Sequence, residues 1–194
     1  MKRSDEMLTL YYSPHMTSVD NEAGRASGHA DVPLSERGRV QAEELGRHYA
    51  PLALDAVFSS DLQRAYTTAE IAFAARGVPL ARDARLRECD FGRMTQCSPL
   101  ELEHERHITE PYPGGESLRT VVEHVGTFLS DVLREHDSKT IVVIGHRATK
   151  YGLEYWCGDA SLDEIVRTPW EWRDVAIWRY EVTGDNLARR ADIR

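Results

Sequence analysis

The feature that most constrains the fold is a short apolar run, Thr140-Ile141-Val142-Val143-Ile144-Gly145, which is rich in β-branched residues. Side chains along a strand alternate between the two faces of a sheet, so this run places apolar groups on both faces. Such a strand is expected inside a parallel sheet that is covered by helices on both sides. Residues 7–12 and 56–59 are also predicted to be strands, and residues 175–182 are predicted to form a last edge strand.

Helical patterns separate these strands. Ser35 is placed to cap a helix that ends before Pro51, and residues 62–76 form a second helical pattern. Apolar residues recur at helical spacing over residues 118–133, and a fourth helix is predicted over about 147–157. This alternation predicts an α/β fold of three layers, α/β/α, with a mostly parallel central sheet. A length of 194 residues suits one core, so we predict a single domain over residues 1–194.

Composition narrows the classes of partner. The net charge is −8 and no long Lys/Arg cluster is present, which argues against a nucleic-acid partner. No apolar run approaches the roughly 20 residues of a membrane span. The first residues are charged and carry no secretory signal, so the expected location is cytoplasmic. Cys89, Cys97 and Cys157 are predicted to be free thiols, because an odd number without a close pair fits neither disulfides nor a zinc site.

Five polar residues follow predicted strands or lie near their ends: His15, Asn21, Arg64, Glu88 and His146. In such sheets ligands bind beyond the carboxyl ends of the strands, where His15 and His146 are expected. Each residue alone has an ordinary explanation, as a surface charge or a structural histidine. Only their joint arrangement indicates a site.

Six sequence blocks lie in order along residues 7–158. They are Leu8–Tyr11 leading to His15, with Ser18 and Asn21 following; Gly24–Ser35 leading to Gly38 and Gln41-Ala42; Phe58–Ala69; Leu86–Gly92; Pro113–Ser117; and Val142–His146. In this order they resemble the blocks of the histidine phosphatase superfamily, in its phosphoglycerate mutase-like group. The resemblance implies the fold of that group for most of the chain.

The resemblance also implies a two-step transfer through a phosphohistidine on His15, which attacks phosphorus as a neutral imidazole. Glu88 is then the acid that protonates the leaving oxygen, and afterwards the base that activates water. The residues implied to act on the phosphoryl oxygens are Arg64, His146, Asn21 and Ser18. This chemistry needs no metal and no other cofactor, because the protein supplies the cations. The implied partner is a small phosphorylated substrate. Many relatives form homodimers, which this sequence does not require.

One block departs from the family. The usual Arg-His-Gly is replaced by Pro14-His15-Met16, so one phosphate-binding arginine is missing. Losing a bidentate arginine is expected to lower phosphate affinity or rate by on the order of 10² to 10⁴. Met16 is expected to place bulk beside the nucleophile. Arg147 stands where the family usually has a small residue. We hypothesise that its side chain turns into the pocket and restores the charge; the alternative is that it points outward.

Three functions remain compatible with these residues. The first is a phosphatase acting on a small phosphorylated metabolite. The second is a hydrolase or lyase that reuses the His15 and Glu88 pair for a different leaving group. The third is a non-catalytic anion-binding protein. Joint retention of a nucleophile and an acid favours the first, and a mutase is less favoured because it must exclude water.

The substrate pocket is expected to be shaped by residues 82–106 and by a long loop over residues 107–117. Its candidate contacts are Arg87, Arg106, His107 and Tyr112. The tryptophan-rich segment 170–173 is predicted to lie at the edge of the core, with an oligomer interface as the alternative.

Overall fold

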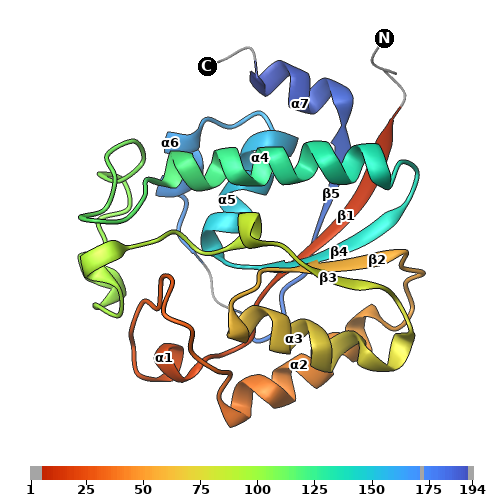
Figure 1. Cartoon of the computed structure of the whole chain (residues 1–194), viewed down its shortest axis with the longest axis horizontal. Coiled ribbons are helices and arrows are strands. Elements are labelled where there is room, and N and C mark those ends of the chain that lie inside the picture. Colours follow the sequence, from red (N-terminus) through yellow and green to blue (C-terminus); the bar gives the residue numbers. More distant parts are fainter. Residues whose placement is uncertain (1–5, 171–172, 192–194) are drawn as a thin grey trace.

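A five-stranded sheet lies between two layers of helices (Figure 1). The computed structural model describes residues 6–170 and 173–191. Its strands are β1 (Met7–Pro14), β2 (Ala56–Ser59), β3 (Leu80–Arg82), β4 (Thr140–Gly145) and β5 (Trp178–Thr183), in the order β3-β2-β4-β1-β5. Only β5 runs antiparallel to its neighbour, so the predicted mostly parallel α/β/α architecture is confirmed. The sequence did not predict β3, because three residues are too few to show a pattern.

The helices form the two outer layers. One layer holds α2 (Glu36–Tyr49) and α3 (Gln63–Phe73), and the other holds α4 (Leu118–Glu135), α5 (Arg147–Cys157), α6 (Leu162–Arg167) and α7 (Gly184–Ala191) (Figure 1). A short α1 (Val19–Glu22) follows β1, and 3-10 turns occupy Ala74–Arg76, Ala84–Leu86, Gly92–Met94 and Pro99–Glu101. The four predicted helices are confirmed. Helices α1, α6 and α7 were not predicted, because they are too short to show a strong periodic pattern.

The central strand β4 divides the core into two halves. Ile141 and Val143 pack into the cluster under α4 and α5, whereas Val142 and Ile144 pack into the cluster against α2 and α3. All four side chains are fully buried. The apolar run is therefore buried on both faces of the sheet, as its composition predicts. Its burial also fixes the position of His146, which follows the strand.

Pro14 ends β1 without breaking the ladder. The N–H of Thr9 donates to the carbonyl of Lys139, and that of His15 donates to the carbonyl of Gly145, so alternate residues of β1 face β4. Position 14 therefore faces β5, whose pairing with β1 already ends at Tyr12. A proline costs no ladder hydrogen bond there.

Further predictions concern the cysteines, membrane-spanning segments and the number of domains. All three cysteines are free thiols, as predicted. Among the helices of the described residues, none has the length and hydropathy to cross a bilayer. The single domain over residues 1–194 stays a prediction.

The close contact between α4 and α5 gives a test of the packing. A Cβ added to Gly126 would lie 2.3 Å from an atom of the Trp156 ring, which is held by a 2.7 Å hydrogen bond to the carbonyl of Val122. We expect Gly126→Ala to lower the free energy of unfolding by about 1–3 kcal/mol, although alanine favours helices. Urea unfolding measures this. The exposed neighbour Thr127 provides the control, since Thr127→Ala should change stability by less than about 0.5 kcal/mol. Stabilisation by Gly126→Ala would contradict the contact.

Candidate active site

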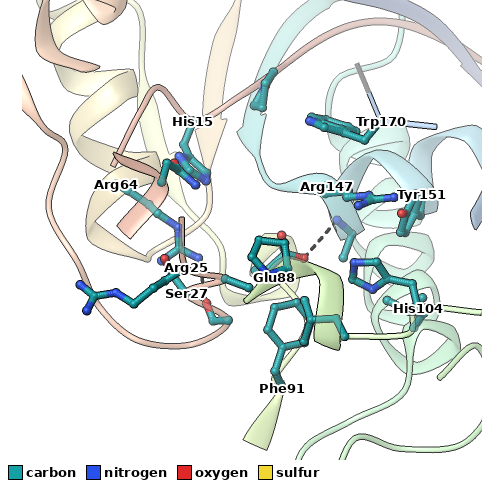
Figure 2. A pocket seen from close by; sticks show the side chains of 18 residues that line it. His15, Arg25, Ser27, Arg64, Glu88, Phe91, His104, Arg147, Tyr151 and Trp170 are labelled. Atoms are coloured by element: carbon teal, nitrogen blue, oxygen red, sulfur yellow. Dashed lines mark hydrogen bonds between the residues drawn. The ribbon is translucent and has the colours of Figure 1, made fainter. Parts of the chain in front are cut away.

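A cavity of about 200 Å³ opens beyond the carboxyl ends of β1 and β4. His15 reaches it from the end of β1, Arg64 from the first turn of α3, and Glu88 from the segment after the 3-10 turn Ala84–Leu86. Figure 2 shows His15 and Arg64 on one wall, with Glu88 between them and the opposite wall. The fold thus brings three distant segments to one cavity, as the predicted topology requires.

His15 is buried, with 8% of its surface exposed, and its ring is oriented by one backbone group. Its Nδ1 lies 2.7 Å from the carbonyl oxygen of Met16. A carbonyl only accepts, so Nδ1 carries the proton and Nε2 of the neutral ring keeps its lone pair. Burial, helped by the nearby charge of Arg64, lowers the pKa of His15 to about 3. The ring is therefore a neutral imidazole at physiological pH, which is the nucleophilic form.

His146 lies beside His15 and is completely buried, and the two ring centroids are 5.0 Å apart. Burial, followed by the charge of Arg64, holds the pKa of His146 well below its usual range. Neither ring nitrogen has a hydrogen-bond partner among the described residues. Buried polar groups are normally paired, so these nitrogens are candidates for a bound group. His146 does not itself line the cavity, but its ring packs against a residue that does.

Arg64 is the buried cation on this wall, with 1% of its surface exposed. Nη1 donates to the carbonyl of Ala30 at 2.9 Å and Nη2 donates to that of Gly28 at 2.8 Å. Its guanidinium thus holds the loop after α1 as well as facing the cavity. Burial lowers its pKa, and the charge of Glu88 opposes that effect.

Glu88 is held at the N-terminus of α5. Its Oε1 accepts from the backbone N–H of Cys89 at 2.9 Å and from that of Ala148 at 3.1 Å. Its own carbonyl lies 2.7 Å from Nε2 of His29, which therefore donates to it. One oxygen of the carboxyl group is therefore held by two backbone N–H groups, and Glu88 lines the same cavity as His15.

Asn21 and Ser18 have different positions. Asn21 lines the cavity, and its Oδ1 accepts from the N–H and hydroxyl of Ser18. The Nδ2 group of Asn21 is therefore the donor that remains for a ligand. Ser18 is completely buried and caps α1, and it does not line the cavity. The structure thus brings Asn21, but not Ser18, to the cavity surface.

Comparisons with known proteins identify the family. The model of the histidine phosphatase superfamily (branch 1) matches residues 14–192. The chain belongs to that superfamily. Phosphoserine phosphatase 1 of Hydrogenobacter thermophilus is 33% identical over 150 residues, which cover 72% of this chain and 71% of that protein. The probable phosphoglycerate mutase GpmB of Salmonella choleraesuis is 29% identical over 202 residues, covering 92% and 94%. The solved structure of YhfR from Bacillus stearothermophilus has a TM-score of 0.77 at 26% identity and covers 88% of this chain and 90% of that one.

In this histidine phosphatase superfamily member, Pro14 lines the cavity and supplies neither charge nor donor. The expectation for Met16 was wrong. Its side chain does not line the cavity but is buried in the core cluster with Leu34, Ala42 and Leu45. Only the carbonyl of Met16 acts on His15. The sequence could not show this, because the direction of a loop side chain depends on the backbone path after the strand.

Arg147 turns into the cavity rather than outward. Figure 2 places it beside Tyr151 and Trp170, across the cavity from His15 and Arg64. Its charge contributes to lowering the pKa of His104 to about 4, after the larger effect of burial. Restoration of the missing arginine by Arg147 stays a prediction, and the position of the side chain on the far wall does not favour it.

The four candidate substrate contacts do not line the cavity. Arg87 forms two 2.7 Å hydrogen bonds to Asp61, and Arg106 is exposed beside Glu110. His107 and Tyr112 are buried, and their rings are stacked with centroids 3.9 Å apart. The loop over residues 107–117 is irregular, as predicted. However, the cavity is lined instead by Pro99, Leu102 and His104, which precede it.

Several cavity residues were not predicted individually. Arg25, Ser27 and Gly28 lie in the block Gly24–Ser35, and Phe91 lies in the block Leu86–Gly92. His104, Tyr151 and Trp170 come from separate segments and form no local motif. Trp170 was predicted to lie at the core edge or at an interface, but it lines the cavity. Its ring centroid lies 6.1 Å from that of Trp178. Glu171 and Trp172 lie outside the described residues.

The protonation of His15 predicts a pH dependence of stability. Its folded pKa of about 3 lies below the ordinary value of 6.5, so the unfolded chain takes up a proton first as the pH falls. The contribution of His15 to the free energy of unfolding is therefore complete above pH 6.5, and it is lost as the pH falls from 6.5 towards the folded pKa of about 3. Between pH 7 and pH 5 we expect His15→Gln to lose about 2 kcal/mol less unfolding free energy than the wild type. Urea unfolding at both pH values measures this. Comparison within each protein cancels the effect of the substitution on packing, and equal losses would contradict a neutral His15.

Proposed function

We propose that this protein is a phosphatase that hydrolyses a small phosphorylated metabolite through a phosphohistidine on His15. The observation that carries the proposal is the orientation of His15. Met16 fixes the proton on Nδ1, so Nε2 is the nucleophilic atom, and Glu88 lines the same cavity. The cavity volume of about 200 Å³ suits a small ester. The names of the relatives, a phosphoserine phosphatase and a probable phosphoglycerate mutase, support phosphoryl chemistry at this site.

In the first step Nε2 of His15 attacks phosphorus and the bond from phosphorus to the ester oxygen breaks. Glu88 gives its proton to the leaving oxygen, which departs as an alcohol. The position of Glu88 within the cavity suits this transfer.

In the second step water attacks the phosphohistidine. Glu88, now a carboxylate, takes a proton from the water, and the bond from phosphorus to Nε2 breaks with its electron pair returning to His15. Arg64 lowers the energy of the transition state by binding the phosphoryl oxygens, and the one N–H of the neutral His146 ring donates to the same group. Asn21 adds a donor from Nδ2. Because Pro14 replaces an arginine, Arg64 is the guanidinium on this wall, and weak binding of inorganic phosphate is expected.

A panel of esters tests the function. We expect turnover of p-nitrophenyl phosphate and of sugar phosphates. His15→Ala should remove it by at least about 10³-fold, because the covalent route is lost. Rapid quenching should trap an acid-labile phosphoenzyme in the wild type and none in the variant. His48→Ala, which changes an exposed histidine of α2, is the control and should keep activity. Turnover of non-phosphate esters alone would favour a different hydrolase. Anion binding without any turnover would favour a binding protein.

The role of Glu88 is tested by the leaving group. Glu88→Gln keeps the size of the side chain but cannot give up a proton. We expect the first step to fall by about 10² to 10⁴ with an alkyl phosphate, whose oxygen must be protonated. With p-nitrophenyl phosphate the burst of nitrophenolate should be much less affected, since that anion leaves unprotonated. Equal losses of the first step with both esters would show a merely structural role.

A further inference from the structure

The cavity has a second charged end that the phosphoryl chemistry does not use. Three arginines line the cavity, and two of them are already engaged. Arg64 donates to the carbonyls of Gly28 and Ala30, and Arg25 pairs with Asp20 at 2.8 Å. The third, Arg147, forms no ion pair with a carboxylate of residues 6–170 or 173–191. Its Nε is buried and makes no hydrogen bond within those residues.

Two aromatic rings lie near this guanidinium. Its central carbon lies 5.4 Å from the ring centroid of Tyr151 and 6.0 Å from that of Trp170. The Tyr151 hydroxyl is also buried without a hydrogen-bond partner among the described residues, and burial raises its pKa to about 12. The Nε of Arg147 and the neutral hydroxyl of Tyr151 therefore lie on one wall, each buried without a hydrogen-bond partner by distance and angle among the described residues. Buried donors of this kind are normally paired, which points to a ligand.

The electrostatics separate this end from the phosphoryl end. The charge of Arg64 lowers the pKa values of His15 and His146, whereas that of Arg147 acts on His104, Tyr112 and Tyr151. His104 has a pKa of about 4 and is neutral at physiological pH, so it adds no charge there.

The rest of the lining is largely apolar. Phe91, Leu102 and Leu118 are almost fully buried and offer no donor to a charged group. A substrate with a second anionic group would therefore place that group at Arg147.

We propose that Arg147 is a specificity residue that binds a carboxylate on the part of the substrate remote from the phosphoryl group. The inference rests on the proposed phosphatase function, and it defines the substrate class as small phosphomonoesters with a carboxylate. A carboxylate is favoured because Nε and a neighbouring Nη of arginine form a planar pair of donors that matches its two oxygens. Tyr151 supplies a further hydroxyl donor beside that pair.

A matched pair of ligands tests the proposal by binding. 3-Phosphoglycerate and glycerol 3-phosphate differ only in a carboxylate against a hydroxymethyl group. Calorimetry on the full-length His15→Gln protein measures both dissociation constants without consuming the ligand. We expect 3-phosphoglycerate to bind roughly 10- to 100-fold more tightly. Adding Arg147→Met should bring the ratio to within about threefold of one. Arg147→Lys should give an intermediate ratio, because an ammonium keeps the charge but not the planar pair.

A second cation on α5 provides the control. Lys150 pairs with Glu154 and lies 5.0 Å from the ring of Trp178, but it does not line the cavity. Lys150→Met removes the same charge from the same helix and should leave the ligand ratio unchanged. An unchanged ratio in Arg147→Met, or failure of both ligands to bind, would overturn the proposal. Equal weakening of both ligands would instead place Arg147 on the phosphoryl group.

Turnover by the wild type is a separate readout. Absence of turnover would contradict the phosphatase function, whereas the ratio of dissociation constants would still decide the role of Arg147.

Discussion

The parallel pairing of β1 with β4 is the interaction on which the site depends. Its register places Ser13 opposite Ile144 and Pro14 opposite Gly145. The next residue of each strand is a histidine, so His15 and His146 leave the sheet side by side, with ring centroids 5.0 Å apart. A shift of one residue would send the alternating side chains of β4 to the wrong faces of the sheet. The core that buries β4 therefore also holds the two histidines together.

Burial then controls the charge of the site. His15 and His146 are held neutral by desolvation and by the charge of Arg64, which is itself buried between carbonyl oxygens. The result is a neutral imidazole beside a buried cation. A protonated His15 would have no lone pair for attack on phosphorus. Pro14, which lines the same cavity, adds neither charge nor a donor to this arrangement.

The two ends of the cavity are built from different parts of the chain. The phosphoryl end comes from residues in the family blocks, namely His15, Arg64, Glu88 and His146. The far end comes from Arg147, Tyr151 and Trp170, of which Arg147 and Tyr151 belong to α5.

The sequence by itself determined the layers of the fold and the positions of His15 and His146. These depend on local apolar patterns and on the rule that ligands bind beyond parallel strands. It also indicated Arg64 and Glu88 through their blocks. The tertiary structure alone decided that Met16 packs into the core, that Ser18 caps α1, and that Arg147 lies with Trp170 on the far wall. The physical reason is that side-chain direction after a strand, and contacts between segments far apart in the chain, depend on packing rather than on local sequence.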